Sequence, residues 1–157
     1  MILAAAAHNF EEWLGRIRLL ELENELARRL GLAMAHPPVE QFEVALVIAT
    51  VVPAVVLGIC GLGPLTRAKA VGIAFVSSLF LTNVLLPHAI LTAAAGGYTP
   101  GLATAVLINL PLGIAILRSI AGDRTIGRGA LTAIVAGSLV ALPLTVSAAY
   151  SAARLLG

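Results

Sequence analysis

The sequence predicts an all-α protein: a polytopic bundle of transmembrane helices that forms one membrane domain, residues 1–157. Hydrophobic residues make up 59% of the chain and charged residues only 11%, with a mean hydropathy of +0.99. Soluble domains carry roughly 25% charged residues. Long uncharged runs are the second observation, because a helix of about 20 apolar residues crosses a bilayer. The small net charge of +2, with no basic run, leads us to expect no nucleic-acid partner.

The first 33 residues are predicted to form two helices that do not fully cross the membrane. Residues 1–15 would extend roughly 22 Å at about 1.5 Å per residue, less than the hydrocarbon core of about 30 Å. We therefore expect a partial fifth span that ends before Arg16. Residues 16–33 alternate leucines with charged residues at helical spacing, which predicts an amphipathic helix at the membrane surface.

Four full spans are predicted in the remainder of the chain. Two uncharged runs, Val44 to Thr66 and Gly129 to Ala153, each account for one crossing. The uncharged run from Ala70 to Leu117 is too long for one span and about right for two separated by a turn. The predicted spans are 44–64, 70–95, 100–117 and 129–153.

The turn between the two middle spans is predicted at "GGYTPG", residues 96–101. Gly96 and Gly97 are expected to end one helix. Thr99 is expected to be the N-cap of the next helix, with Pro100 at its first position.

The arginines and lysines suggest an orientation. Five lie in the short stretches 64–69 and 118–128, where Asp123 is the only acidic residue. Those on the other side of the membrane are mostly mixed with glutamates. The positive-inside tendency favours a cytoplasmic location for the two short loops.

A candidate site begins at "AHNFEEW", residues 7–13. His8, Glu11 and Glu12 share one helical face, because positions i, i+3 and i+4 are neighbours on a helix. Burying two adjacent carboxylates near hydrocarbon is costly unless a proton, a cation or a partner neutralises them. The cluster therefore indicates a site, and the alternative is an interfacial helix start whose charges lie among lipid headgroups or in water.

Depth in the membrane links this cluster to two later residues. His8 lies eight residues before Arg16, and His88 lies eight residues before Gly96. Asn109 lies eight residues after Gly101. At the helical rise each distance is roughly 12 Å, so we expect all three side chains at one depth.

One imidazole and two carboxylates suit zinc, iron or manganese, and His88 would add a ligand from another helix. The predicted metal ligands are His8, Glu11, Glu12 and His88, with Glu11 and Glu12 as candidate catalytic acids or bases. We expect a divalent metal cofactor, zinc or iron. Asn109 is a candidate for a supporting polar contact.

The stretches "HNFEEW", "NVLLPH" (83–88) and "GGYTPGLATAVLINLP" resemble the HxxEE-motif family of small bacterial integral membrane proteins, whose function is uncharacterised. The resemblance covers roughly residues 3–117. It implies signature positions at His8, Glu11, Glu12, Asn83 and His88, a structural turn at 98–101, and a location in the bacterial inner membrane. Asn83 thereby joins Asn109 as a candidate cofactor-binding residue. Asn83 and His88 are five residues apart, about 140° on a regular helix, so a local change near Pro87 is needed to bring them together.

Several functions fit these residues. The first is a metal-dependent enzyme of hydrolase or oxidoreductase type that acts on an apolar, lipid-like substrate, with Glu11 as a base near the metal. A metal-free variant uses the two glutamates as acid and base for isomerisation or cyclisation. A proton or cation transporter or relay is a third function, and a non-catalytic membrane assembly protein is a fourth. The expected partners are the lipid bilayer and an apolar small molecule, with homo-oligomerisation left open.

Overall fold

The computed structural model describes residues 1–31 and 37–156, and this part of the chain contains helices and no strand. Four helical segments are long and apolar enough to cross a membrane. They are Val39–Gly61, Arg67–Ala95, Leu102–Asp123 and Arg128–Leu156. The predicted all-helical fold is confirmed at this level.

The first and last of these segments are the continuous helices α3 (Val39–Gly61) and α8 (Arg128–Leu156). The second segment consists of α4 (Arg67–Asn83), η1 (Val84–Ala89) and α5 (Ile90–Ala95). The third consists of α6 (Leu102–Thr104), η2 (Ala105–Asn109) and α7 (Leu110–Asp123). The two middle segments are each interrupted, the second by a kink with a non-helical residue inside η1 and the third by the π-helical stretch η2. π-Helical turns inside α-helices are frequent at functional sites.

The helix ends differ from the predicted spans by a few residues. The predicted span 44–64 corresponds to a helix that begins earlier, at Val39, and ends at Gly61. The predicted span 100–117 corresponds to helical segments that continue past Arg118 to Asp123. Charged side chains at helix ends can extend toward water, so the absence of charge underestimates the length of a helix.

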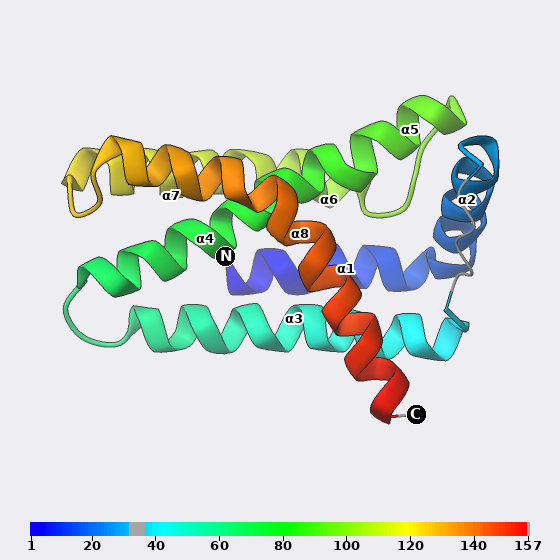
Figure 1. Cartoon of the computed structure of the whole chain (residues 1–157), viewed down its shortest axis with the longest axis horizontal. Coiled ribbons are helices and arrows are strands. Elements are labelled where there is room, and N and C mark those ends of the chain that lie inside the picture. The colour runs from blue at the N-terminus through cyan, green and yellow to red at the C-terminus, as the bar shows by residue number, and fades with distance from the viewer. Residues whose placement is uncertain (32–36, 157) are drawn as a thin grey trace.

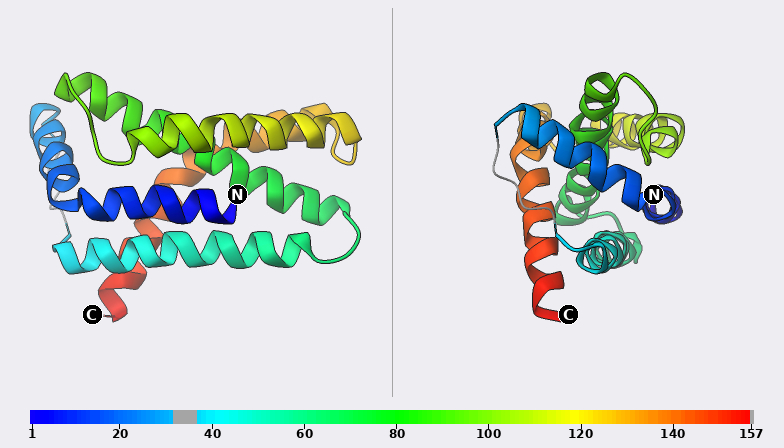
Figure 2. Two further views of the ribbon diagram at one scale, coloured as in Figure 1. Left: turned by 180° about the vertical axis from the view of Figure 1, so that it is seen from behind. Right: turned by 90° about the vertical axis from the view of Figure 1, so that its right-hand side faces the viewer.

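Helix α1 (Ile2–Leu14) lies alongside α3 and covers only part of its length, so the N-terminus is about halfway along the bundle (Figure 1; Figure 2). Asn9 fixes this arrangement. Its side-chain amide donates to Thr50 Oγ1 at 2.7 Å and to the Leu46 carbonyl at 3.4 Å, both on α3. These two contacts hold α1 against α3.

Helix α2 (Arg16–Arg29) runs across one end of the bundle (Figure 1). It is shorter than the predicted helix 16–33, because Leu30 and Gly31 form a turn and the last two predicted positions lie outside the described residues. Its apolar face packs against α3 and α5. The buried residues of this cluster are Leu19, Leu20, Leu22, Phe42, Leu46 and Leu91.

Small side chains allow α4 to pack closely against α7 and α8. Ala70 and Ala74 of α4 are fully buried in a cluster with Ile120 and Ile126. Further along, Thr82 and Ser138 share a hydrogen bond of 2.6 Å between their hydroxyl oxygens. Small residues and hydroxyl groups of this kind are typical of helix contacts in membranes.

The turn before α6 corrects one prediction. Gly96 ends α5 in a left-handed conformation, as expected, but Thr99 is not the N-cap of the next helix. The Thr99 hydroxyl instead pairs with the Thr92 hydroxyl at 2.7 Å. The helix begins after Gly101, whose φ of 89° is a left-handed conformation that suits glycine.

Candidate metal centre

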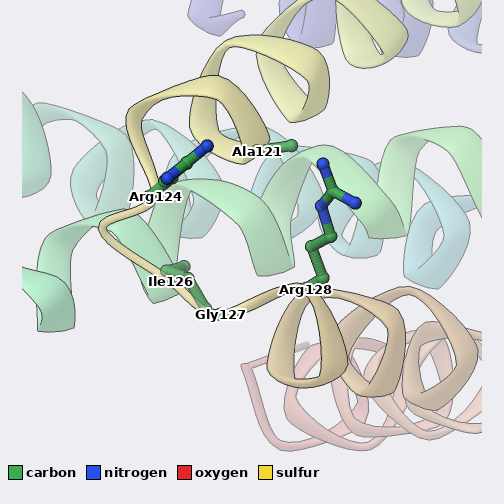
Figure 3. Close-up of a pocket in the computed structure, with 5 residues that line it drawn as sticks. All are labelled: Ala121, Arg124, Ile126, Gly127 and Arg128. Carbon is green, nitrogen blue, oxygen red and sulfur yellow. The ribbon is translucent and has the colours of Figure 1, made fainter.

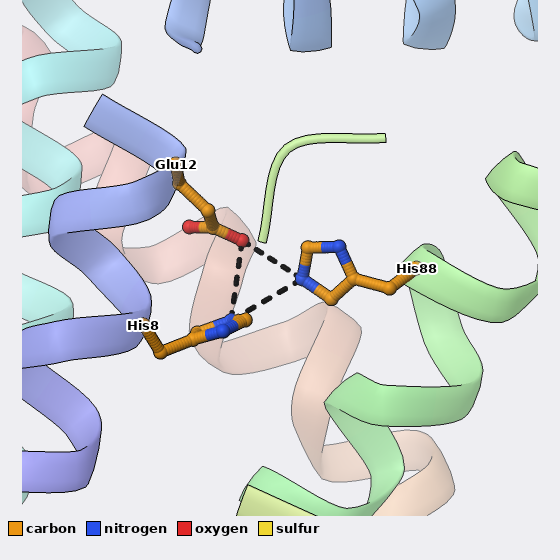
Figure 4. A group of neighbouring side chains, drawn as sticks. All are labelled: His8, Glu12 and His88. Carbon is orange, nitrogen blue, oxygen red and sulfur yellow. Dashed lines mark hydrogen bonds and ion pairs between the residues drawn. The ribbon is translucent and has the colours of Figure 1, made fainter. Parts of the chain in front are cut away.

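Three side chains from two distant parts of the chain converge inside the bundle (Figure 4). His8 and Glu12 come from α1 and His88 comes from η1, and all three are buried. The Glu12 Oε1 atom lies 2.9 Å from His88 Nε2 and 3.3 Å from His8 Nε2. The two Nε2 atoms are 3.2 Å apart, so one carboxylate oxygen and two imidazole nitrogens face a common point.

These separations fit a shared ion. Ligand atoms about 2.0 to 2.1 Å from a tetrahedral zinc ion lie roughly 3.3 Å from each other, close to the three observed distances. Two imidazole nitrogens and a carboxylate oxygen are also ligands that zinc and iron accept. The group could therefore hold a divalent metal.

Asn83 completes the group from the last residue of α4. Its amide nitrogen is 2.7 Å from His8 Nε2 and 3.4 Å from His88 Nε2. A half-turn of the amide would present the Asn83 oxygen at the same place, since the two amide atoms are nearly equal in size. Asn83 therefore offers either a hydrogen bond to an imidazole or a fourth oxygen donor.

The segment between Asn83 and His88 is not a regular helix, which explains how the two side chains meet. Leu86 has φ −120° and ψ 113°, far from helical values, and divides η1. The 140° separation expected on a regular helix therefore does not apply here.

Glu11 does not join the three converging side chains, contrary to its expected role as a metal ligand. Its carboxylate lies at the start of α6, where it accepts hydrogen bonds from the backbone N–H groups of Gly101 (3.0 Å), Ala103 (3.2 Å) and Thr104 (2.8 Å). The Tyr98 hydroxyl also donates to it. Glu11 thus caps the beginning of a helix that is ninety residues away in the sequence.

Partial burial and this hydrogen bond to Glu11 raise the pKa of Tyr98 to about 12. Tyr98 therefore stays protonated at neutral pH and remains a donor. The contact between α1 and the 96–101 turn does not depend on pH in the physiological range.

Thr104 connects Glu11 to His8 and determines which nitrogen of His8 faces the site. Its hydroxyl donates to Glu11 Oε2 at 2.5 Å, because a carboxylate can only accept. The same oxygen lies 3.0 Å from His8 Nδ1. With its proton committed to Glu11, the Thr104 oxygen accepts from Nδ1–H, so the lone pair of a neutral His8 lies on Nε2, toward the group. Metal-binding histidines are commonly oriented by such a contact.

Gly101 leaves the space that the group needs. A Cβ atom at this position would lie 2.3 Å from His88 Cε1 and 2.9 Å from Glu12 Cγ. No other residue fits without moving these side chains, and the left-handed φ adds a second reason for glycine.

Asn109 is fully buried in η2, but neither atom of its amide has a hydrogen-bond partner among the described residues. The hydrogen-bonded network around His8 therefore does not include it. His88 Nδ1 likewise has no partner in the described part of the chain. Both groups have hydrogen-bonding capacity left for water or a ligand.

Two residues of the site, Thr104 and Gly101, have roles that the sequence did not predict. Thr104 carried no signal beyond its place in the first turn after "GGYTPG". Gly101 was predicted only as part of a structural turn. A polar residue in the first turn of a span, three positions after a glycine, is a pattern that could have indicated both residues.

Comparison with known proteins identifies the family. The family model for proteins of unknown function with an HXXEE motif matches residues 1–116, most of the chain, and the protein belongs to that family. No curated protein and no solved structure matches the chain. The converging group contains the histidine and the second glutamate of the HXXEE motif, and Glu11 is the first.

Proposed function

We propose that this member of the HXXEE family is an integral membrane enzyme that binds one divalent metal ion through His8, Glu12 and His88. The observation that carries the proposal is the convergence of His8 Nε2, His88 Nε2 and Glu12 Oε1 within 2.9 to 3.3 Å of each other. Three atoms that accept protons or metals rarely lie so close in a buried place without a cation or shared protons.

The donor set favours a catalytic ion over a purely structural one. Structural zinc sites are usually closed by four protein ligands, often cysteines. Here three strong donors leave a position open, with the Asn83 amide beside it. Zinc or iron is the expected ion, and such an ion polarises a substrate carbonyl or activates water or oxygen.

The surrounding residues hold the ligands in place. Thr104 fixes the orientation of His8, Glu11 fixes Thr104, and Gly101 makes room for His88. Because five groups already donate to the Glu11 carboxylate, we assign it a positioning role in place of the general base expected from the sequence. Glu12 is the carboxylate that contacts the reaction centre.

The membrane setting suggests the substrate class. In our proposal the four long helices cross a bacterial cytoplasmic membrane, α1 enters it as a partial fifth span, and α2 lies at its surface. The outer face of α1 exposes Leu3, Phe10 and Leu14, which suits contact with lipid chains. An apolar, lipid-like molecule would therefore reach the site from within the bilayer.

Metal content of the purified protein tests the proposal. Wild type, purified in detergent without chelators and loaded with zinc or iron, should hold about one ion per chain by mass spectrometry. H8A, H88A and E12Q should lose most of it. E40Q, which changes an exposed carboxylate at the start of α3, should retain it.

Each variant should elute as one species with wild-type helix content, so that loss of metal is separated from loss of fold. Absence of bound metal from folded wild type, or retention by all three site variants, would overturn the proposal. Incubation of the loaded protein with bacterial lipid extract, with E12Q as the inactive control, should then reveal the consumed lipid.

A further inference from the structure

A hollow lies at the connection between α7 and α8. It is open at the surface, and its volume is about 380 Å³. The residues that line it are Ala121, Arg124, Ile126, Gly127 and Arg128. It is at the opposite end of the bundle from α2 (Figure 1).

Two arginine side chains provide the charge of this hollow. Arg124 and Arg128 extend from the connection on either side of it, with their nitrogen ends toward Ala121 (Figure 3). Both are exposed. Neither makes an ion pair or a side-chain hydrogen bond with any residue in the described ranges, although Asp123 is adjacent in the sequence. Their donors are therefore available to an anion.

The connection that carries these arginines is anchored. Ile126, between them, is only 2% exposed and packs in the cluster with Ala70 and Ile120. Arg124 ends α7 in a left-handed conformation with φ 53°, where glycine is more usual. The buried Ile126 side chain therefore fixes the backbone of the connection between the two arginines.

The position along the chain indicates the kind of anion. Arg124 follows the last residue of one candidate span, and Arg128 is the first residue of the next. Arg67 and Lys69, at the start of α4, lie at the same end of the bundle (Figure 1). Basic residues directly outside a span meet lipid headgroups, and anionic lipids attract them.

We propose that this hollow binds the phosphate headgroup of an anionic phospholipid, held by Arg124 and Arg128. Guanidinium groups pair with phosphate oxygens through two parallel hydrogen bonds. Ala121, which also lines the hollow, would lie beside the glycerol part of the lipid. This site is separate from His8, Glu12 and His88, so it does not depend on a metal at that group.

Native mass spectrometry in a neutral detergent tests the proposal with phosphatidylglycerol and phosphatidylcholine as probes. Wild type should bind about one phosphatidylglycerol in preference to phosphatidylcholine. R124Q/R128Q should bind it roughly 30-fold more weakly, since each basic residue at an anionic surface contributes about 1 kcal/mol. R18Q/R154Q, which removes two exposed arginines elsewhere, should stay close to wild type.

R124K/R128K separates charge from loop structure, because lysine binds phosphate as a point charge. We expect it to bind phosphatidylglycerol more weakly than wild type, because the paired guanidinium hydrogen bonds are lost, and more tightly than R124Q/R128Q, because the charge remains. Equal loss in R124K/R128K and R124Q/R128Q would attribute the effect to a disturbed loop and overturn the proposal. Equal loss of phosphatidylglycerol binding in R18Q/R154Q, or no lipid preference in wild type, would also overturn the proposal. Displacement of the lipid by millimolar inorganic phosphate would overturn it too, because the hollow would then be a site for the free ion.

Discussion

Replacing Thr104 by valine removes one hydroxyl group from the metal centre and leaves its shape almost unchanged. The hydroxyl lies between Glu11 Oε2, at 2.5 Å, and His8 Nδ1, at 3.0 Å. In T104V both contacts are lost. We expect weaker metal binding without loss of the fold, because His8 remains present but is no longer held with Nε2 toward the ion.

The size of the effect follows from the two contacts. Glu11 keeps its backbone donors and Tyr98, so the carboxylate loses little. The His8 Nδ1–H group becomes a buried donor without a partner, which costs about 1 to 3 kcal/mol. Loss of a contact that orients a metal-binding histidine typically weakens metal affinity by about 10- to 100-fold. The expected change in Kd lies in that range.

The assay is a zinc titration against a chromophoric chelator, with wild type and variant in the same detergent. Thr104→Ser keeps the hydroxyl and should bind almost as wild type does. Thr145→Val is the matched control, because Thr145 is an exposed threonine whose hydroxyl, among the described residues, bonds only to the Leu142 carbonyl in its own helix. It should leave the Kd unchanged.

Two results would refute the reasoning. If T104V binds zinc as tightly as wild type, the hydroxyl does not orient His8. If T104S loses as much affinity as T104V, packing of the side chain matters and the hydrogen bonds do not.

Two further predictions follow from the structure. Gly101→Ala should lower both the melting temperature and the metal content, because the added Cβ would lie 2.3 Å from His88 Cε1. Gly97→Ala is the control and should change neither, because its Cβ would meet no atom within 4 Å. A wild-type melting curve for G101A would contradict the expected crowding. Burial raises the pKa of Glu23 on α2 from 4.5 to about 7, and the charge of Glu12 adds to the shift. The folded state therefore favours protonated Glu23, and the stability of the fold should fall as the pH rises from about 4.5 through 7. Glu23→Gln should reduce this dependence of the melting temperature on pH. The same pH dependence in wild type and E23Q would contradict the prediction.

The sequence allowed the long helices to be predicted because crossing a bilayer requires a long apolar run. All four candidate spans overlap the predicted ranges. Their ends could not be predicted from charge alone, since Arg118 lies inside α7. The sequence indicated a local change near Pro87 but not its form, which is a kink at Leu86 inside η1.

Depth in the membrane predicts which side chains lie at one level, but it does not predict which of them point toward each other. Counting residues placed His8, His88 and Asn109 at one level, and the structure brings the two imidazoles within 3.2 Å. Asn109 makes no hydrogen bond to them in the described structure. A count of residues gives the depth of a side chain but not the direction in which it leaves its helix.

Rotation about the helix also explains why Glu11 and Glu12 differ. Successive residues are about 100° apart on an α-helix, so Glu11 and Glu12 lie on opposite sides of the direction of His8. Glu12 points to His88, and Glu11 points to the start of α6. Helical spacing shows that the three residues share a broad face, whereas the neighbouring helices decide which partner each one meets.

X-ray absorption at the metal edge of the loaded protein tests whether His8, Glu12 and His88 hold the ion. We predict a first shell of nitrogen and oxygen atoms only, about 2.0 to 2.1 Å from the metal, with the multiple-scattering signature of two imidazoles. H88A should reduce that signature to one imidazole. A shell of oxygen atoms without imidazole scattering, or a spectrum that H8A and H88A leave unchanged, would contradict a metal centre at His8, Glu12 and His88.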